Sequence, residues 1–542
     1  MTELSVGGAL APLLEARGVT DVFGIPGNHT VELYRGLAQS TIRHITTRHE
    51  QGAGFMADGY ARATGRPGVC LLISGPGLLN AATALGQALA DSVPVLAIVA
   101  VGARETLGAG LGTLHELPEQ LQTAAGFSRL ALRVSAPEEF PVALERAFEL
   151  FATARPGPVV IEIPTDVQKL TFPGAAEAHK AVQGVGMVPA ADPGLITDCA
   201  QRLHDADAPL LVLGGGAVGA ADECRQLAVA LDAPVIATSN AKGIVPPGHP
   251  LHVGGSPSLP GLQAALAEAD CVLAIGTEFG ETDYDLLFQG APAARSGSLI
   301  RVDIDAAQLK RNRRADVAVC ADAAAFVPAL RTALVERPER GGAARAATLR
   351  DGCLREAHWH AEMAQFFATL GTSLGDVCVV GDSTRPTYYA TWQYEPQRPR
   401  RYFHSVTGFG TLGYSIPAAM GAAVGLDEPV LCLIGDGGAQ FTLTEFATAV
   451  QERLPVCFLV WANAGYEEIT NSMIGADVST DSTMIGGPDY VALAAAYGLP
   501  SATPRDHTAL ASALAEAAAR EGPTLVLVRQ EDFLSQPSGE WY

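Results

Sequence analysis

Two polar side chains that each follow an apolar run stand out in this sequence, because their types suit a metal ion. Asp436 comes soon after the run 430–434, and Asn463 follows the run 455–461. A strand-helix-strand unit would bring the ends of two parallel strands to one sheet edge, which is where open α/β sheets bind ligands. A carboxylate and an amide oxygen at such an edge suit an octahedral Mg²⁺ that also holds phosphate oxygens.

Small residues after Asp436 add an anion-binding feature. They would let a diphosphate approach the backbone amides at a helix start. These residues are Gly437, Gly438 and Ala439. Taken alone, Gly-Asp-Gly is equally typical of an ordinary tight turn between a strand and a helix. The Asn-x-Gly sequence at 463–465 favours the ligand-binding interpretation.

These two stretches together resemble the Gly-Asp-Gly…Asn motif of thiamine-diphosphate enzymes. The resemblance implies that Asp436, Asn463 and the backbone carbonyl of Gly465 bind the metal, here Mg²⁺. Family members often carry Asn-Asn at the second position, whereas this chain has Ala462 before Asn463. The difference leaves the predicted ligand in place.

A second segment resembles the part of this family that activates the cofactor. It comprises residues 48–53 and 57–62. By resemblance, Glu50 hydrogen-bonds the aminopyrimidine ring and favours its imino tautomer, whose nitrogen removes the proton from the thiazolium carbon. This role requires a carboxyl group held out of bulk water against a ring nitrogen. An isolated glutamate would more simply be a solvated carboxylate at a helix start, but the flanking pattern favours the catalytic interpretation.

Other stretches match the cofactor-binding segments of the family. In relatives, a large apolar side chain at the position of Leu412 wedges between the two cofactor rings, and simple core packing is compatible with that role. Besides Glu50 and the three small residues after Asp436, the resemblance assigns to the cofactor Gly75, Asn80, Asp382, Ser383, Thr384, Gly410 and Leu412.

Short β-rich runs alternate with Ala-rich helical stretches along the chain, which is the pattern of parallel α/β sheets. The runs form three blocks, so we expect an α/β protein with three parallel-sheet domains. In the order of thiamine-diphosphate decarboxylases, these are a pyrimidine-binding domain (1–180), a central Rossmann-like domain (190–340) and a diphosphate- and metal-binding domain (350–542). The predicted strands are 22–25, 69–73, 95–101, 159–163, 210–213, 235–237, 272–275, 299–304, 377–380, 430–434, 456–460 and 524–528.

The composition indicates a globular protein and argues against some functions. Of 542 residues, 48% are hydrophobic and 17% charged, so each domain can fill a core. The net charge of −22 argues against nucleic acid as a partner, since coating it needs a basic surface. Nine cysteines occur singly and are expected to be buried reduced thiols. The apolar runs are too short for a bilayer and no signal peptide is visible, so we expect a cytoplasmic protein without a membrane partner.

A Gly-x-Gly-x-x-Gly pattern in the central block raises the alternative of a nicotinamide dehydrogenase. Gly214, Gly216 and Gly219 follow the run 210–213. Such a site also needs an acidic residue at the end of the next strand, and the run 235–237 ends without one. We therefore favour a structural glycine turn. Because the synthases that this chain resembles hold FAD or ADP in this domain, FAD stays open but is not favoured.

Five polar residues are candidates for contact with a substrate. By resemblance, the loop with Asn28 and His29 points polar side chains at a substrate carboxylate, and His115 falls where relatives carry an active-site histidine or glutamine. A histidine suits proton transfer near neutral pH, although either one could equally be an ordinary loop residue. Glu467 and Glu468 should begin a helix beside the metal site, where they would favour a cationic substrate or transfer protons. The alternative is the simple preference for acidic residues at a helix start.

The resemblance covers essentially the whole chain and is to the acetolactate-synthase and benzoylformate-decarboxylase branch. Segments 24–37, 113–117 and 277–285 look like those of 5-guanidino-2-oxopentanoate (2-ketoarginine) decarboxylases. A guanidinium substrate would pair with carboxylates. Segment 277–285 carries an acidic cluster, for which a solvated acidic loop is the simpler interpretation; its members are Glu278, Glu281, Asp283 and Asp285.

This resemblance implies a non-oxidative 2-oxo acid decarboxylase that uses thiamine diphosphate and Mg²⁺ and releases an aldehyde and carbon dioxide. The expected catalytic residues are Glu50, His29, His115 and Glu468. The alternative is an acetolactate-synthase-like carboligase, which joins two 2-oxo acids or an aldehyde. In this branch the cofactor lies between two subunits, so a homodimer is required and a homotetramer is expected.

Overall fold

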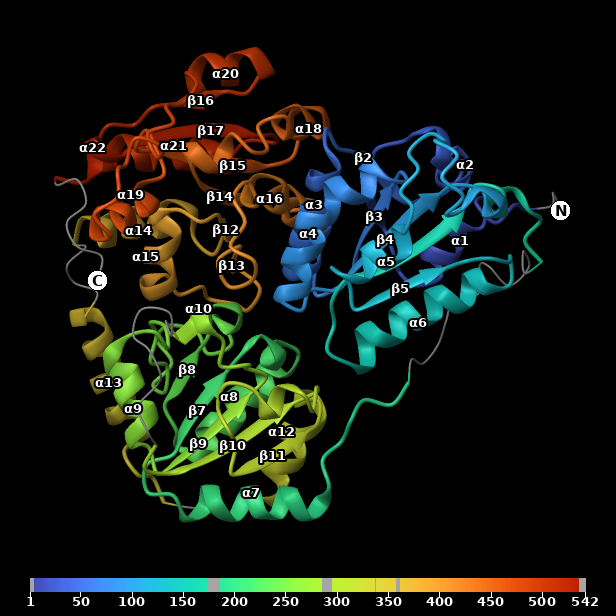
Figure 1. Cartoon of the computed structure of the whole chain (residues 1–542). Coiled ribbons are helices and arrows are strands. Elements are labelled where there is room, and N and C mark those ends of the chain that lie inside the picture. The colour runs from blue at the N-terminus through green and yellow to red at the C-terminus, as the bar shows by residue number, and fades with distance from the viewer. Residues whose placement is uncertain (1–3, 174–185, 285–294, 337, 357–360, 536–542) are drawn as a thin grey trace.

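The computed structural model describes residues 4–173, 186–284, 295–336, 338–356 and 361–535. Three sheets with helices packed around them form three lobes: an N-terminal unit with β1–β6 (blue to cyan), a central unit with β7–β11 (green to yellow) and a C-terminal unit with β12–β17 (orange to red) (Figure 1). Neighbouring strands in each sheet run parallel. The predicted fold class, α/β with three parallel sheets, is confirmed.

The sheet of the N-terminal unit has the strand order β2-β1-β3-β4-β6-β5. Its strands are β1 (Asp21–Gly24), β2 (Arg43–Thr46), β3 (Gly68–Leu72), β4 (Val95–Val101), β5 (Leu130–Arg133) and β6 (Val159–Pro164). Its helices are α1 (Leu10–Glu15), α2 (Val31–Leu37), α3 (Glu50–Thr64), α4 (Pro76–Ala90), α5 (Gln120–Ala125) and α6 (Glu139–Thr153), with 3-10 turns η1 (Asn28–Thr30), η2 (Arg104–Thr106) and η3 (Val167–Lys169). Every residue of β4 is buried and apolar, as expected for a strand covered on both faces.

The sheet of the central unit has the order β11-β10-β9-β7-β8. Its strands are β7 (Leu210–Leu213), β8 (Val235–Ala237), β9 (Cys271–Ile275), β10 (Ser298–Asp303) and β11 (Val317–Cys320). Its helices and 3-10 turns are α7 (Pro193–Asp205), η4 (Gly215–Ala220), α8 (Ala221–Leu231), η5 (Ser239–Ala241), α9 (Pro260–Glu268), α10 (Glu281–Tyr284), η6 (Gln308–Lys310), α12 (Ala323–Ala333) and α13 (Gly342–Glu356). Helix α13 packs on α9, and Arg345 donates to the backbone of Pro209 and Asp232. The expected start of the third domain at residue 350 therefore falls within a helix that packs on the central unit.

The sheet of the C-terminal unit has the order β13-β12-β14-β15-β17-β16. Its strands are β12 (Cys378–Gly381), β13 (Tyr402–His404), β14 (Val430–Gly435), β15 (Val456–Ala462), β16 (Ser501–Ala502) and β17 (Thr524–Arg529). Its helices are α14 (Ala361–Leu374), α15 (Arg385–Gln393), α16 (Ser415–Leu426), α17 (Asp436–Ala439), α18 (Glu445–Glu452), α19 (Glu467–Gly475), α20 (Tyr490–Tyr497), α21 (His507–Ala518) and α22 (Gln530–Phe533). Each of the twelve predicted strands is present, and β2, β5, β11, β13 and β16 are strands that were not predicted.

The N-terminal and C-terminal units share one apolar core because helices α3 and α16 cross at close range. A Cβ on Gly59 of α3 would lie 2.0 Å from the carbonyl oxygen of Ala418. A Cβ on Gly421 of α16 would lie 1.9 Å from the carbonyl oxygen of Met56. Glycine at both positions therefore allows the two backbones to touch.

A buried ionic network joins all three units near this crossing. Arg62 on α3 donates to Asp58 at 2.6 Å and pairs with Asp91. The hydroxyl of Tyr414, from the C-terminal unit, donates to Asp58 at 2.5 Å, and the side-chain amide of Asn240, from the central unit, donates to Asp91 at 2.8 Å. Because the buried charges are paired and hydrogen-bonded, the network fixes the three units relative to one another.

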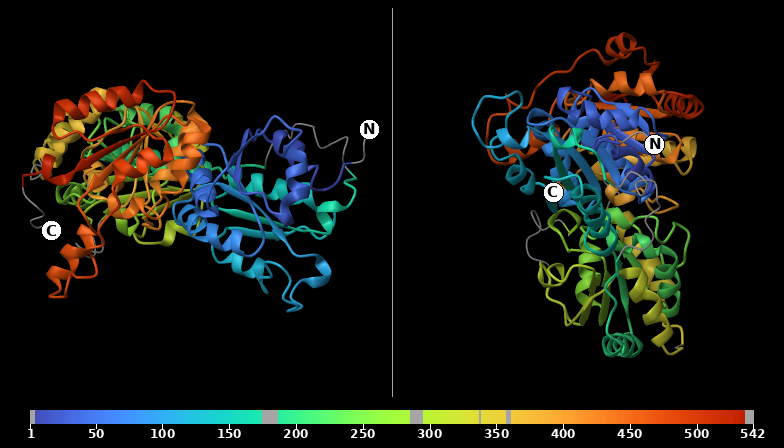
Figure 2. Two further views of the ribbon diagram at one scale, coloured as in Figure 1. Left: turned by 90° about the horizontal axis from the view of Figure 1, so that it is seen from above. Right: turned by 90° about the vertical axis from the view of Figure 1, so that its right-hand side faces the viewer.

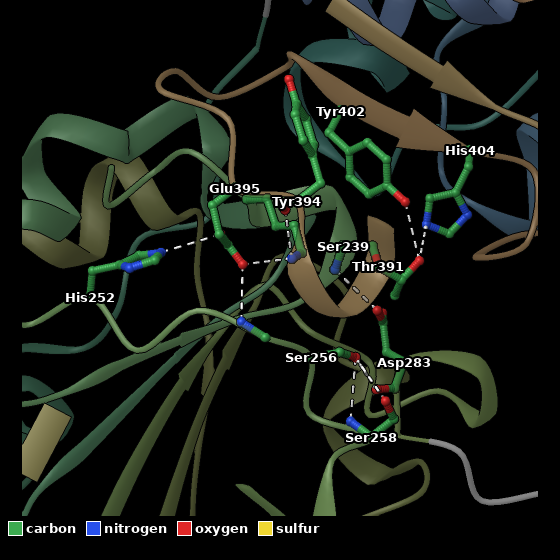
Figure 3. Close-up of polar contacts among 12 residues, drawn as sticks. Ser239, His252, Ser256, Ser258, Asp283, Thr391, Tyr394, Glu395, Tyr402 and His404 are labelled. Atoms are coloured by element: carbon green, nitrogen blue, oxygen red, sulfur yellow. Dashed lines mark hydrogen bonds and ion pairs between the residues drawn. The ribbon is translucent and has the colours of Figure 1, made fainter. Parts of the chain in front are cut away.

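A second polar cluster docks the central unit on the end of α15. Glu395, just beyond this helix, accepts hydrogen bonds from the Lys242 ammonium at 2.7 Å and the Gly255 amide at 3.0 Å. Its other oxygen lies 3.2 Å from Nε2 of His252 (Figure 3). Helix α15 thus has one end held by the central unit and its other end at the carboxyl edge of the C-terminal sheet.

Within the described ranges, no helix is long and apolar enough to cross a membrane. The nine cysteines are free, and eight are buried as predicted. Cys320 is the exception, since it occupies an exposed position on β11, at the edge of its sheet.

Candidate active site

Asp436 is anchored to the ends of two neighbouring strands. It begins α17 directly after β14 and is 5% exposed. One carboxylate oxygen accepts the N–H of Gly437 at 2.9 Å, and the other accepts the N–H of Ala464, beyond β15, at 2.8 Å. Burial raises the pKa of the Asp436 carboxyl, and these amide hydrogen bonds oppose that rise. Each oxygen keeps a further lone pair with which it can bind a cation.

Asn463 and Gly465 lie at the same edge, directly after β15. The Asn463 side-chain nitrogen donates to Glu467 at 2.9 Å, which leaves the amide oxygen as the atom for a metal. The intervening Ala464 has a φ of 64°, a left-handed conformation that is unusual for a residue other than glycine. A Cβ on Gly465 would lie 2.7 Å from the carbonyl oxygen of Thr483, so the close approach requires glycine.

A carboxylate, an amide oxygen and a backbone carbonyl are hard oxygen donors that fit Mg²⁺. Across the part of the chain that the structure describes, no cluster of three or more His, Cys, Asp or Glu side chains could hold a metal. Of the three metal ligands predicted from the sequence, only Asp436 is one of these residue types. The residues present therefore fit a magnesium ion, whose remaining ligands a diphosphate and water would supply.

Small residues are sterically required at the start of α17. A Cβ on Gly437 would lie 2.7 Å from a ring carbon of Tyr466, and a Cβ on Gly438 would lie 3.2 Å from a carboxylate oxygen of Asp382. Ala439 is fully buried. The absence of larger side chains lets a phosphate group approach this turn, where the Gly437 amide already donates to Asp436.

The carboxylate of Asp382 is hydrogen-bonded to the protein backbone. It is fully buried, and its oxygens accept the N–H groups of Ser383 at 2.9 Å and Ser415 at 3.1 Å. Burial raises the pKa of Asp382 to about 6. The residue therefore shapes the turn after β12, on which its neighbours Ser383 and Thr384 lie.

The segment 408–414 faces this turn. The Ser383 hydroxyl donates to the carbonyl oxygen of Gly410 at 3.3 Å. Gly410 has a φ of 66°, and no atom lies within 4 Å of where its Cβ would stand. Leu412 is half-buried, and Thr384 precedes the first turn of α15. The structure thus brings Ser383, Thr384 and Gly410 to the carboxyl edge that also carries Asp436.

Glu467 and Glu468 begin α19, as predicted, but their surroundings differ. Glu467 accepts hydrogen bonds from Asn463 and from Gln530 at 3.0 Å, and it lies 3.1 Å from the buried guanidinium of Arg385. No motif pointed to Arg385, which is the first residue of α15. The Glu468 carboxyl is half-buried, and burial raises its pKa. The positive charge of Arg385 opposes that rise. Glu467 is thus committed to contacts within the protein, and Glu468 is the half-buried carboxylate beside it.

Glu50 lies at the carboxyl edge of the other sheet, in the N-terminal unit. It is the first residue of α3 and is half-buried. Its carboxylate accepts a hydrogen bond from the side-chain amide of Asn80 at 2.9 Å. A Cβ on Gly77 would lie 3.6 Å from the Glu50 carboxylate, so the first turn of α4 borders this group.

Two predicted substrate residues, His29 and His115, meet at this edge. Their rings lie edge to face with centroids 5.6 Å apart, and Nδ1 of His29 is 2.5 Å from the Ser74 hydroxyl. Burial, followed by the charge of His115, lowers the pKa of His29, so its imidazole is neutral at pH 7. Nδ1 of His115 is buried without a hydrogen-bond partner among the described residues.

The backbone holds His115 in place. His115 has a φ of 59°, and its carbonyl oxygen would lie 2.5 Å from a Cβ on Gly75. The Gly75 amide donates to Gln120 at 2.8 Å. Asn28, at the start of η1, is exposed one residue before His29. Glu50, Asn80, His29 and His115 are thus gathered at one sheet edge.

Both edges carry apolar side chains that are more than half exposed. At the N-terminal edge these are Leu111 and Leu114, and at the C-terminal edge Phe441, Ile469 and Met484. Helix α19 has no buried residue. In the left view of Figure 2, α19 (orange) and the loop around residue 110 (light blue) project from the same side of the molecule.

The glycine pattern of the central unit lies beside a separate cavity of about 410 Å³. A Cβ on Gly214 would lie 2.2 Å from the carbonyl oxygen of Gly276, so this glycine lets the loops after β7 and β9 touch, as expected of a structural turn. The cavity walls include Gly216, Gly219 and Glu278.

The described part of the acidic segment, residues 277–284, borders this cavity and is not gathered with Glu50 or Asp436. Glu278 pairs with Arg155 at 2.9 Å, and Asp283 accepts the N–H of Ser239 at 3.1 Å (Figure 3). Glu281 is exposed. Asp285 lies outside the described residues.

Comparison with known proteins identifies the family. Residues 4–124 match the thiamine pyrophosphate enzyme N-terminal TPP binding domain, residues 196–330 the central domain and residues 380–528 the C-terminal TPP binding domain. The chain is 41% identical over 538 residues to a Pseudomonas aeruginosa protein named "Probable 2-ketoarginine decarboxylase AruI", with 97% of this chain and 94% of the relative covered. It is 31% identical to the large subunit of Escherichia coli acetolactate synthase isozyme 1, with 95% of this chain and 92% of that subunit covered. It is 32% identical to the large subunit of isozyme 2 from the same organism, with 90% of this chain and 88% of that subunit covered. The chain belongs to the thiamine pyrophosphate enzymes.

Proposed function

We propose that this protein decarboxylates 5-guanidino-2-oxopentanoate to 4-guanidinobutanal and carbon dioxide with thiamine diphosphate and Mg²⁺. The observation that supports the chemistry is the position of Asp436, Asn463 and Gly465 at adjacent strand ends, where their oxygen atoms would bind the metal. The substrate is supported by the 41% identity to a relative named as a 2-ketoarginine decarboxylase. The half-buried carboxylate of Glu468 beside the same site supports a cationic side chain.

The cofactor, when bound, supplies an electron sink for the pair left behind as carbon dioxide departs. Asp436, Asn463 and the carbonyl of Gly465 would hold the magnesium ion, and the small residues of α17 would admit the diphosphate. Glu50 would hold a proton at a ring nitrogen of the aminopyrimidine, with its carboxylate oriented by Asn80. Ser383, Thr384, Gly410 and Leu412 would border the cofactor from the facing turn.

At the substrate, Asn28 and the neutral His29 would face the carboxylate, and His115 would exchange protons with the product. The contact between the two histidine rings supports this shared role. Glu468 would accept the guanidinium, because Glu467 already pairs with Arg385. Burial around Glu468 strengthens such a pair by excluding water.

We infer that two copies of the chain form each active site. The hydrogen bond of the Glu50 carboxylate is to Asn80 of its own unit, whereas the metal donors belong to the C-terminal unit. Apolar side chains are exposed at both carboxyl edges, and α19 and the loop around residue 110 project from the same side of the molecule (Figure 2), which supports burial of these edges by a second copy. A homodimer would place Glu50 of one chain against the metal site of the other, and two dimers would form a tetramer.

A carboligase is the second candidate, because the chain is also 31% and 32% identical to acetolactate synthase subunits. Product analysis separates the two functions. With thiamine diphosphate and Mg²⁺ present, 5-guanidino-2-oxopentanoate should yield carbon dioxide and 4-guanidinobutanal, and pyruvate, benzoylformate and a branched 2-oxo acid should react poorly. Acetolactate formed from pyruvate as the main product would reject the decarboxylase proposal in favour of the synthase.

A further inference from the structure

One buried carboxylate of the C-terminal unit contacts the backbone immediately before Glu50. Glu445, the first residue of α18, has no exposed surface. Its Oε1 atom accepts the N–H groups of both Arg48 and His49 at 3.0 Å. Its Oε2 atom accepts the hydroxyl of Thr448 at 2.8 Å. One side chain thus crosses the boundary between two units and fixes the two peptide groups that lead into α3.

The approach of Glu445 depends on a glycine in the first turn of α3. A Cβ on Gly52 would lie 2.3 Å from Oε1 and 2.7 Å from the carboxyl carbon of Glu445. Any larger residue would push the carboxylate away from the two amides. The absence of a side chain at Gly52 therefore lets Oε1 of Glu445 lie against the first turn of α3.

The burial of this carboxylate carries an energetic cost. Desolvation raises the pKa of Glu445, and the hydrogen bonds from Thr448, Arg48 and His49 oppose that rise. The guanidinium of Arg48 makes its own hydrogen bonds to the Thr46 carbonyl and to Gln451. An apolar side chain would fill the same space without desolvation, so the carboxylate is best explained by the backbone groups that it orients.

The orientation matters because Glu50 is the next residue after His49. The Glu50 carboxylate itself is held by one hydrogen bond, from the exposed Asn80. The direction in which Glu50 leaves the backbone depends on the chain that leads into it, and Glu445 binds the N–H groups of the two residues directly before Glu50. A displacement of about 1 Å at a catalytic group lowers a rate by about 10²-fold.

We propose that Glu445 is a positioning residue that holds Glu50 in the place from which it activates the cofactor. This inference rests on the proposed role of Glu50. It assigns no contact between Glu445 and the cofactor or substrate. It predicts that the acceptor atom at Oε1, and not the negative charge, is the required property.

Two conservative variants of the full-length protein separate these properties. Glu445→Gln keeps a carbonyl oxygen at the same reach and removes the charge, whereas Glu445→Asp keeps the charge and withdraws the acceptor by one methylene. Glu452→Gln is the matched control, because Glu452 lies on the same helix and bridges to Arg43 of the N-terminal unit at 3.0 Å, away from Glu50. Glu50→Gln tests the role on which the inference rests.

Two measurements report on the position of Glu50 and the backbone before it without measuring turnover. Hydrogen–deuterium exchange by mass spectrometry reads the protection of the amides of residues 48 and 49. Proton exchange at the reactive thiazolium carbon of enzyme-bound thiamine diphosphate, followed in D₂O by NMR, reads activation by Glu50. Cofactor affinity is measured in parallel by isothermal titration calorimetry.

For Glu445→Asp we expect faster amide exchange and a loss of about 10²-fold in cofactor proton exchange, with thiamine diphosphate affinity nearly unchanged. Glu445→Gln and Glu452→Gln should stay close to the wild-type protein. Unchanged cofactor proton exchange in Glu445→Asp, or an equal loss in Glu452→Gln, would overturn the positioning role. Retained cofactor proton exchange in Glu50→Gln would instead reject the proposed role of Glu50, so the two failures are distinguishable.

Discussion

The guanidinium of Arg385 lies 3.1 Å from the carboxylate of Glu467. Glu467 is the first residue of α19, the helix that begins beside the proposed metal site. Glu467 also accepts hydrogen bonds from Asn463 and Gln530. Its charge is therefore balanced inside the protein, and its position supports a predicted metal ligand. The neighbouring Glu468 is left as the carboxylate that a cationic substrate would meet.

Glu468→Gln should therefore change substrate selection. We expect the KM for 5-guanidino-2-oxopentanoate to rise about tenfold, equivalent to about 1.4 kcal/mol for one charge-assisted hydrogen bond. Activity with an uncharged branched 2-oxo acid should change little. The matched variant Glu467→Gln should instead weaken magnesium-dependent cofactor binding, because it disturbs Asn463. Steady-state kinetics with the cationic and the uncharged substrate measures the change in KM. An unchanged KM in Glu468→Gln would show that Glu468 does not take part in substrate recognition.

Glu50→Gln should nearly abolish turnover while the protein stays folded. The substituted amide can keep the hydrogen bond with Asn80 but cannot hold or release a proton, and acid–base groups of this kind contribute about 10²–10⁴-fold to a rate. Circular dichroism and thermal denaturation should match those of the wild-type protein. A variant with full activity would show that cofactor activation does not depend on this carboxylate.

Asp436→Asn should weaken the binding of thiamine diphosphate together with Mg²⁺. The amide can occupy the same space but offers only one oxygen and no charge, so we expect the apparent Kd to rise more than about 30-fold, or about 2 kcal/mol. Titration calorimetry at fixed Mg²⁺ measures this change. Asp489→Asn is a suitable control, since Asp489 caps α20 through Val491 and is exposed. Equal effects in both variants would argue against a metal ligand at Asp436.

His404→Gln should reduce the acid sensitivity of folding. His404 is buried beside Thr391 (Figure 3), and burial lowers its pKa to about 3. In the unfolded chain the pKa is about 6.5, so the unfolded state binds the proton first and stability falls as the pH drops from about 6.5 towards 3. This group alone should cost about 1.4 kcal/mol at pH 5.5.

Urea denaturation at pH 7.5 and pH 5.5 measures the effect of His404. The wild-type protein should lose more stability between the two pH values than the variant does. The glutamine can keep a hydrogen bond to Thr391, so the comparison isolates the titration. The same loss in both proteins would show that His404 does not contribute to acid sensitivity.

The amino-acid sequence alone determined the interior of the three sheets. Strands such as β4 and β14 are covered on both faces, so they appear as continuous apolar runs and were all predicted. The five strands that were missed lie at sheet edges, where one side of the backbone is unpaired. All of them except the buried, three-residue β13 carry partly exposed side chains. The alternating burial of β11 and the two-residue length of β16 leave no continuous apolar signal.

The residues of the proposed active site likewise divide into those with a local sequence signal and those without one. Asp436, Asn463 and Glu50 stand in local motifs, because each lies just after or before an element whose ends a parallel sheet fixes in space. Arg385 and Glu445 have no such signal, since each acts on a partner that is distant in sequence. Only the tertiary structure places Arg385 against Glu467 and Glu445 against the start of α3, because those contacts depend on how helices pack across strands and across units.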